Sequence, residues 1–257
     1  MKTKIIYSIL IAMGAIALTF SIIYSSSILA FIGLGLTFWG IILAYIQTEE
    51  YVKRKLLDAT TLAPLLTLNK VMQELQYEGK AVYLPPKYFK DQEENRVYIP
   101  KQKDGQIPTP EQIQEQENKL FIKNPNGLLL TPPGAELTKL FEKILETTFT
   151  RIDLRHLQQI MPKLFIEDLE IAQNLKIETK DNRILVEIKN SVYKNLNKEV
   201  MKLKNLYPSI GCPLVSAFAC TLARATGKPI VIEKQQTREE GKVIEIEYRI
   251  VEEKTEQ

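Results

Sequence analysis

The sequence predicts an α+β protein: an N-terminal transmembrane helical hairpin, followed by a cytosolic domain in which an antiparallel sheet packs on helices. Two observations carry this prediction. Residues 5–48 form an uncharged run of 44 positions, whereas one membrane-crossing helix needs roughly 20 apolar residues. The rest of the chain alternates helical and strand patterns. Its last strand, Val243–Val251, places isoleucine or tyrosine at every second position, as a strand with one solvated face does.

Composition narrows the class further. The 257 residues are 45% hydrophobic and 25% charged, which excludes a disordered or collagen-like chain. The long apolar run excludes a purely soluble protein. Two cysteines and one histidine exclude a disulfide framework and argue against a zinc site. We therefore expect no metal and no cofactor.

The hairpin is predicted as region 1–48, with spans of about 5–24 and 28–46 separated by a three-serine turn. Small residues offer surfaces for close helix contact, namely Gly14, Ala15, Gly33, Gly40 and Ala44. Basic residues flank both outer ends of the two spans, namely Lys2, Lys4, Lys53, Arg54 and Lys55. The positive-inside rule then places both termini in the cytoplasm of a cell-membrane protein with two spans.

Two further expectations concern this region. Lys53, Arg54 and Lys55 are candidates for contact with anionic headgroups at the membrane interface. The alternative to a hairpin is a cleaved signal peptide followed by one anchor. The first apolar run is longer than the roughly 7–15 residues of a signal core, which favours the hairpin.

Region 49–118 is predicted to contain juxtamembrane helices followed by a Pro-rich excursion. We expect residues 49–58 to continue the second helix, and Pro64 to open a new one that ends near Gly79. Residues 81–84 are predicted as a short strand. Residues 85–118 are rich in proline and charge, which is typical of a surface excursion, with a short strand over 97–99.

Region 119–257 is the predicted α+β domain. A strand over 128–130 precedes a helix opened by Pro132–Gly134, and Asp153 is expected to cap the next helix. The remaining elements are expected in the order strand 175–178, strand 184–188, basic amphipathic helix 193–204, helix 213–226, strand 230–233 and strand 243–251. Gly227 is expected to stop the helix before it.

The most unusual residue is Cys212, at the start of an almost wholly apolar helix that also contains Cys220. Backbone N–H groups at a helix start favour a thiolate, so Cys212 is the candidate for a reactive thiol or a ligand-contacting residue. The alternative is that Cys212 packs as a small buried hydrophobe. Cys220, eight residues on, is expected in the core, and His156 on a helix surface.

The lysine side chains of the basic helix 193–204 are expected to face solvent. The alternative is that they contact an anionic membrane. Residues 49–257 carry a net charge near +1, which argues against nucleic acid as a partner. The expected partners are the lipid bilayer through residues 5–46, and a protein or a small apolar ligand.

The segment Leu175–Val251 resembles the end of vinyl-reductase-like small-molecule-binding domains, which are related to TRAPP-type scaffold subunits. The resemblance lies in the order of its elements: a hairpin, a helix, an apolar helix that begins at Cys-Pro, and a final hairpin. Those domains often carry a cysteine in the last strand, whereas Val243–Val251 has none, so no ligand residue is carried over. The whole chain resembles uncharacterised archaeal two-helix membrane proteins in its segments 79–86, 163–170 and 209–212 with 227–229. This resemblance implies a membrane location and an α+β cytosolic domain.

Three functions are compatible with the sequence. The first is a non-enzymatic, membrane-anchored binding or scaffold module with its domain in the cytosol. The second is a thiol-based enzyme or redox sensor that uses Cys212. The third is a structural subunit whose hairpin packs inside a larger membrane complex.

Overall fold

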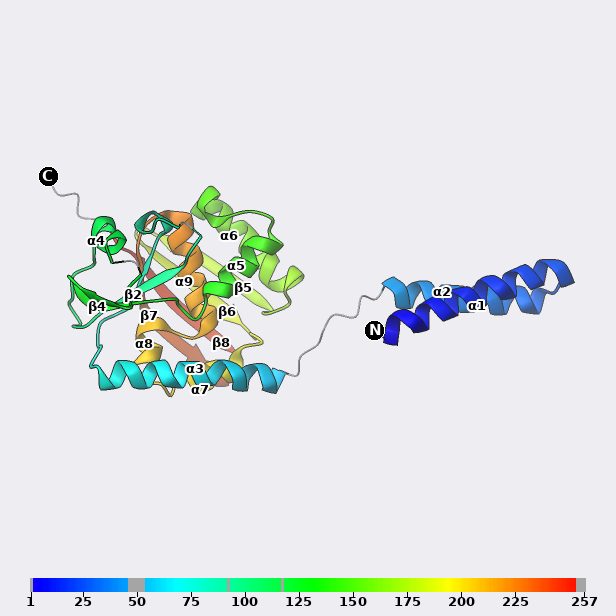
Figure 1. Cartoon of the computed structure of the whole chain (residues 1–257), viewed down its shortest axis with the longest axis horizontal. Coiled ribbons are helices and arrows are strands. Elements are labelled where there is room, and N and C mark those ends of the chain that lie inside the picture. The colour runs from blue at the N-terminus through cyan, green and yellow to red at the C-terminus, as the bar shows by residue number, and fades with distance from the viewer. Residues whose placement is uncertain (1, 46–53, 92, 117, 253–257) are drawn as a thin grey trace. The chain divides into compact units, whose positions relative to one another are not determined.

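The structure, a computed structural model, describes residues 2–45, 54–91, 93–116 and 118–252. The chain divides into two compact units, Met1–Arg54 and Lys55–Gln257. The first unit contains two apolar helices, and the second contains all the described strands and the remaining helices (Figure 1).

The first unit is a pair of helices, α1 (Lys2–Tyr24) and α2 (Ser27–Tyr45), joined by a tight turn at the serines. Both helices are long and apolar enough to cross a membrane. Glycines make the close helix contact that the sequence predicted. A Cβ on Gly33 would lie 2.8 Å from the Leu18 side chain, and one on Gly40 would lie 2.6 Å from that of Ile11.

The second unit is built on one antiparallel, eight-stranded sheet with the order β3-β4-β2-β1-β7-β8-β6-β5. Its strands are β1 (Val82–Leu84), β2 (Arg96–Pro100), β3 (Phe121–Lys123), β4 (Asn126–Leu130), β5 (Asn174–Lys180), β6 (Arg183–Lys189), β7 (Ile230–Arg238) and β8 (Val243–Ile250). Because β1 pairs with β7, residues about 150 positions apart meet at the centre of the sheet.

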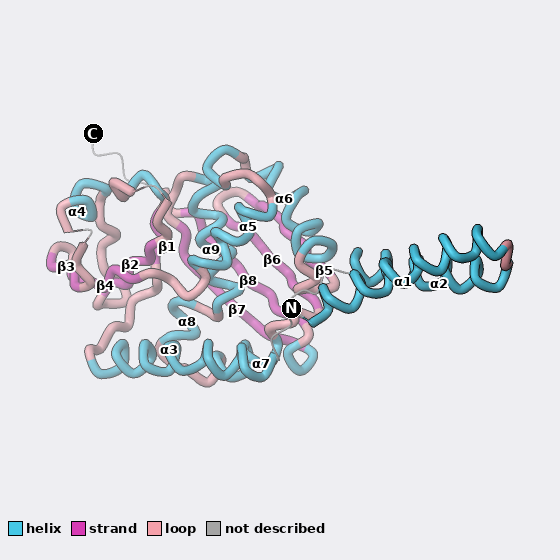
Figure 2. The backbone as a smooth tube through the Cα atoms, turned by 45° about the vertical axis from the view of Figure 1, so that its right-hand side comes forward, coloured by secondary structure: helices cyan, strands magenta, loops and turns pink. Residues whose placement is uncertain are grey.

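The helices of this unit are α3 (Arg54–Glu74), α4 (Pro110–Gln114), α5 (Ala135–Ile144), α6 (Leu154–Lys163), α7 (Lys194–Val200), α8 (Leu206–Ile210) and α9 (Pro213–Thr226). Helix α9 lies across one face of the sheet, with α5 and α6 beside it, and α3, α7 and α8 lie along one end (Figures 1 and 2). The stretch Leu206–Thr226 is also apolar enough to cross a membrane, but it is 89% buried inside this unit.

Two hydrophobic clusters fill the domain. The larger lies between the sheet and α9, α5 and α6, and includes three packed rings, Phe141, Phe165 and Phe218. The smaller lies on the opposite face, where Tyr88, Phe89 and Ile113 cover the half of the sheet around β1, β2 and β4.

The structure corrects two predictions in region 49–118. Pro64 lies inside α3 and does not begin a helix. A proline inside a helix removes the hydrogen bond to the fourth preceding carbonyl and crowds that carbonyl, yet α3 continues through Pro64. The interpretation of residues 85–118 as a surface excursion is wrong for β2, which pairs with both β1 and β4 and buries Val97, Tyr98 and Ile99 completely.

Several local predictions are confirmed. Helix α9 begins at Pro213 and ends before Gly227, which adopts the left-handed conformation (φ 61°). The Asp153 side chain caps α6 by accepting from the backbone N–H of His156 at 2.7 Å. The predicted helix 193–204 is shorter, ending at Val200, and α8 follows it.

Candidate functional site

The centre of the candidate site is an irregularity in β7. The β7–β8 ladder pairs Ile232 with Tyr248 and then Lys234 with Glu247, so Glu233 is an extra, bulged residue. Bulges redirect a side chain and are frequent beside functional sites. This bulge also shifts the alternation of side chains between the two faces of the sheet. The side chains of Ile232 and Gln235 are three positions apart, yet both lie on the helix-covered face.

The ladder between β1 and β7 stops at the same place. It contains only the pairs Val82–Val231 and Tyr83–Ile230. Beyond it, side chains bridge the two segments. Lys80 Nζ lies 2.8 Å from Glu233 Oε2 and also donates to the Glu233 carbonyl oxygen at 3.2 Å.

Glu233 is held by a second cation. Arg249 Nε, from β8, donates to Glu233 Oε1 at 2.6 Å. Burial alone would raise the pKa of Glu233, but the hydrogen bonds and charges of Lys80 and Arg249 hold that pKa below its usual value. Glu233 is therefore a carboxylate fixed between two cations, and only 27% of its side chain is exposed.

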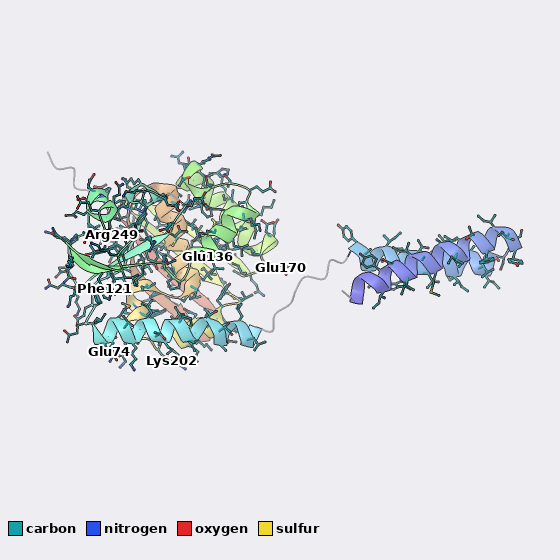
Figure 3. The ribbon with its side chains drawn as sticks, viewed as in Figure 1. Glu74, Phe121, Glu136, Glu170, Lys202 and Arg249 are labelled. Carbon is teal, nitrogen blue, oxygen red and sulfur yellow. The ribbon has the colours of Figure 1, made fainter. Side chains whose placement is uncertain are left out.

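A groove of about 680 Å³ opens around this trio. It is bounded by the start of β1, the 100–107 loop after β2, the connection between α7 and α8, and the β7 bulge. Arg249, one of its lining residues, is labelled in Figure 3. The lining residues are Tyr77, Glu78, Gly79, Lys80, Val82, Pro100, Lys103, Asp104, Gly105, Ile107, Lys204, Asn205, Pro208, Ser209, Val231, Glu233 and Arg249. Ser209 fixes one wall, because its hydroxyl donates to the Gly79 carbonyl at 2.9 Å.

The comparison with family models gives one match, a domain of unknown function named DUF7982, over residues 3–249. The chain belongs to this family. The matched residues include both apolar helices and the whole Lys80–Glu233–Arg249 trio, so the DUF7982 unit contains the hairpin and the groove together.

No curated protein and no solved structure matches the chain. The DUF7982 match does not bear on the resemblances to archaeal membrane proteins or to vinyl-reductase-like domains, which stay predictions.

The structure places Cys212 at the N-cap of α9, as expected, but buries its side chain. Burial raises the pKa of the Cys212 thiol to about 11, and this effect exceeds the opposing hydrogen bonds from the backbone of Val215 and Leu214. Burial likewise raises the pKa of Cys220 to about 12. The expected lowering of the Cys212 pKa by the helix start is therefore overridden by desolvation.

The other predicted site residues lie apart from the groove. Lys53 lies outside the described residues, as do the side chains of Arg54 and Lys55. His156 is exposed on α6. Among the described residues, no three His, Cys, Asp or Glu side chains group as a metal site would require.

A second polar cluster lies behind the bulge, under α7 and α8. The Asn197 amide donates to Thr237 Oγ1 at 3.2 Å, and the Gln235 amide donates to the Tyr207 carbonyl. Three buried oxygens of this cluster have no hydrogen-bond partner within the described structure, namely Asn197 Oδ1, Tyr207 Oη and Gln235 Oε1. Buried polar groups of this kind are commonly satisfied by ordered water.

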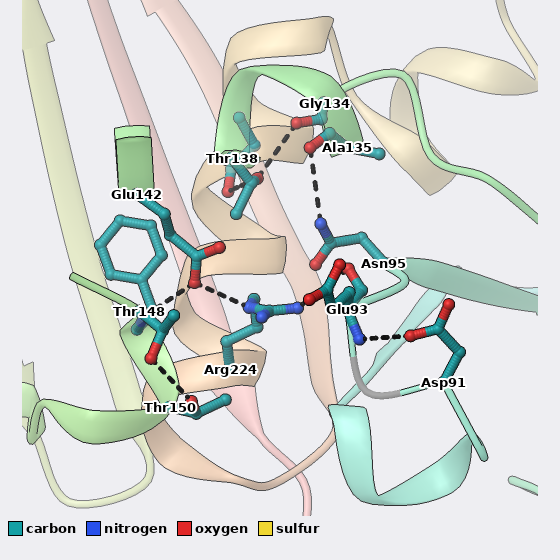
Figure 4. A network of polar contacts seen from close by, with 12 residues as sticks. Asp91, Glu93, Asn95, Gly134, Ala135, Thr138, Glu142, Thr148, Thr150 and Arg224 are labelled. Carbon is teal, nitrogen blue, oxygen red and sulfur yellow. Dashed lines mark hydrogen bonds and ion pairs between the residues drawn. The ribbon is translucent and has the colours of Figure 1, made fainter. Parts of the chain in front are cut away.

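A third polar network joins α5 to α9 (Figure 4). Arg224 Nε lies 3.0 Å from Glu142 Oε1, and both side chains are largely buried. The same carboxylate oxygen accepts from the backbone N–H of Phe149 at 2.8 Å. Arg224 also donates to the Glu93 carbonyl at 3.4 Å, so this pair ties the segment before β2 to the helical layer.

The sheet has a second hollow, of about 330 Å³, on the uncovered face of β5, β6, β8 and β7. Ion pairs cover this face, including Arg183 with Glu247 at 2.7 Å and Arg238 with Glu245 at 2.9 Å. Exposed pairs of this kind stabilise little, and we interpret this face as a solvated sheet surface.

Sequence reasoning missed all three residues of the trio. In the sequence, Lys80 stands out only as part of a helix-to-strand turn, and Glu233 only as the end of a strand. Residues 230–232 are all apolar and residues 233–238 are all polar, so no alternation in the sequence marks the bulge.

Proposed function

We propose that this protein is a membrane-anchored binding module with both termini in the cytoplasm, and that the groove at Glu233 binds an extended segment of a protein partner. Two helices of membrane-crossing length support the anchor. The bulged Glu233, fixed between Lys80 and Arg249 in the wall of an open groove, is the observation that carries the binding site.

The chemistry of the groove favours a peptide. Its apolar residues include Val82, Val231 and Ile107, whereas its charged residues have both signs. A polypeptide can place side chains of both kinds along one line. The β1–β7 ladder ends at the groove with the pair Val82–Val231, and beyond it the two segments are joined by the Lys80 side chain. Backbone groups at the end of a ladder are where an extended segment can add.

Binding is better supported than thiol chemistry. A reactive cysteine needs access and thiolate character, whereas Cys212 is only 1% exposed and has a raised pKa. A structural subunit of a membrane complex would use the hairpin and not the groove. The experiment described next distinguishes a groove that binds a partner from a hairpin that does so.

The test is site-specific photo-crosslinking of the full chain in the cells that produce it. A benzoyl-phenylalanine replaces Lys103, whose side chain is 76% exposed at the groove, and in a parallel protein it replaces the exposed Lys228. We expect a discrete adduct from position 103, mapped by mass spectrometry to one peptide, and none from position 228.

Matched charge reversals make the result specific. Lys204→Glu, at the groove, is expected to reduce the adduct by more than about fivefold, since loss of a rim charge costs about 1 kcal/mol and the reversal adds repulsion. Lys228→Glu should leave it unchanged. Equal adducts from both positions, or insensitivity to Lys204→Glu, would contradict the groove. Adducts formed only from lipid-facing positions of α1 and α2 would favour the structural subunit.

A further inference from the structure

The outward face of α3 is unusual for a helix on a protein surface. Its inner face packs into the domain through Leu65 and Met72, which are 4% and 0% exposed. On the outer face Leu56 is 59% exposed and Leu66 is 49% exposed. Exposed small residues, Ala59 and Ala63, lie between them at helical spacing.

Charge is nearly missing from this stretch. Between Leu56 and Asn69 the sequence contains one charged residue, Asp58. A helix with one solvated face normally carries polar and charged side chains there. The exposed polar side chains between Leu56 and Asn69 are Thr60 and Thr67, and both hydroxyls donate to carbonyls of their own helix. The outer face of α3 therefore has the composition of a contact surface.

Lysines lie beside this face. Helix α7 lies near α3 in both views of the backbone (Figures 1 and 2). The connection from α7 to α8 contacts α3, because the Asn69 side chain accepts from the backbone N–H groups of Asn205 at 3.2 Å and Leu206 at 3.1 Å. Glu74 and Lys202 are labelled on the same side of the domain in Figure 3. The exposed residues of α7 and the turn after it are Lys194, Asn195, Lys198, Glu199, Met201, Lys202 and Lys204, in which lysine predominates.

The short connection between α2 and α3 limits how far this surface of α3 can lie from the hairpin. Helix α2 ends at Tyr45 and α3 begins at Arg54. Whatever their conformation, the residues between them reach no further than about 30 Å, at roughly 3.5 Å per residue. If α1 and α2 cross a bilayer, the start of α3 stays within that distance of its surface.

We infer that the outer face of α3, flanked by the lysines of α7, docks on the anionic headgroups of the membrane that holds the hairpin. This inference rests on the proposed membrane anchor. Helices that lie in the membrane interface typically place leucines at the headgroup boundary and lysines beside them. A second copy of the chain is the competing occupant, but the surplus of lysine favours an anionic partner over an identical surface.

The test uses the full chain in nanodiscs that contain one copy each, made of phosphatidylcholine with or without phosphatidylglycerol. A nitroxide is attached to Leu66→Cys or, as a second variant, to Leu56→Cys. The matched control is Leu185→Cys, a 43%-exposed leucine on the uncovered sheet face. Cys212 and Cys220 are buried, so they do not compete for the label. Collision rates with oxygen and with a water-soluble nickel chelate report the depth of each label.

With phosphatidylglycerol present, the labels at 66 and 56 should be reached by oxygen and shielded from nickel, whereas the label at 185 should show the reverse. Lys198→Glu should weaken docking by more than about fivefold, because loss of one lysine near an anionic surface costs about 1 kcal/mol and the new carboxylate is repelled. Labels at 66 and 56 that nickel reaches as readily as 185 would overturn the docking surface. So would labels shielded from both reagents, since protein would then cover them.

A label at Phe31→Cys separates this failure from failure of the anchor. Phe31 is 80% exposed on α2. If nickel is excluded at 31 but not at 66, the anchor stands and the docking surface is wrong. If nickel reaches 31 as well, the proposed membrane anchor itself is wrong.

Discussion

The Tyr248 hydroxyl, on β8, donates to the carbonyl oxygen of Val215 in α9 at 2.8 Å. Tyr83, on β1, makes the equivalent bond to the carbonyl of Ile210 at 2.6 Å. Burial raises the pKa of both tyrosines, so both hydroxyls remain neutral donors. Two strands on either side of β7 thus hold the end of α8 and the first turn of α9 by buried hydrogen bonds.

Removing either hydroxyl should destabilise the domain without changing its shape. Tyr83→Phe and Tyr248→Phe each leave a buried carbonyl without that donor, which costs about 1–3 kcal/mol. The measurement is the free energy of unfolding by denaturant, with Tyr45→Phe, an exposed tyrosine in α2, as the control. A change equal to that of the control would show that these bonds contribute nothing net.

The Arg224–Glu142 pair should be far more costly to break than a surface pair. Arg224→Met leaves a largely buried carboxylate without its cation, and we expect a loss of about 3–5 kcal/mol. Lys139→Met breaks the exposed pair with Glu136 and should cost less than about 1 kcal/mol. Adding Glu142→Leu to Arg224→Met should recover part of the loss. Equal costs for the two single variants would refute the assignment of a buried pair.

The two thiols should react slowly and make stability fall at high pH. Their pKa values, about 11 for Cys212 and about 12 for Cys220, lie above the roughly 8.5 of an unfolded thiol. The stability that comes from burying neutral thiols is complete below the unfolded pKa and is lost as the pH rises through the folded values.

A thiol-reactive disulfide at neutral pH should therefore modify the native protein slowly and the denatured protein at once. Cys212→Ala should flatten the fall in unfolding free energy above about pH 9. Rapid modification of one thiol in the native protein would instead restore the alternative of a reactive Cys212.

The two helices of the hairpin should separate when a large side chain enters their contact. Gly33→Leu must displace Leu18 or the helix backbone, since even a Cβ there would be 2.8 Å from the Leu18 side chain. Gly35→Leu is the matched control, because nothing lies within 4 Å of its Cβ position. Dipolar coupling between nitroxides on α1 and α2 should weaken for Gly33→Leu only. Weakening in both variants would show that hydrophobic bulk alone opens the pair.

The proposed topology places the serine turn outside and the domain inside. A membrane-impermeant maleimide should label Ser27→Cys in intact cells, and Lys228→Cys only after permeabilisation. The reversed pattern would contradict the positive-inside assignment. The intact mass of the purified chain tests the signal-peptide alternative, since cleavage would remove the first apolar run.

Local chemistry explains what was predictable. The bounds of α9 follow from Pro213, whose missing N–H is not needed at a helix start, and from Gly227, which adopts a positive φ without strain. Asp153 as a cap and the alternation in β8 are equally local signals. Each depends on residues within one or two turns of one another.

What was missed depends on distant partners. The sequence predicts the short strand over 97–99, but its proline-rich surroundings resemble a loop, and its buried place in the sheet follows only from pairing with β1 and β4. The candidate site has the same origin. Lys80 lies two residues before β1, Glu233 lies in β7 and Arg249 in β8, and only the sheet order and the bulge bring their charges together.

The pairing of β1 with β7 also governs the sequence of events during synthesis. Strands β1 to β4 leave the ribosome well before β7, so this half of the sheet lacks its central neighbour until residues 230–250 have been made. The two apolar helices emerge long before that point. A nascent chain that inserts them would therefore complete its sheet while already tethered, and its unpaired β1 edge would be the stretch most in need of protection by a chaperone.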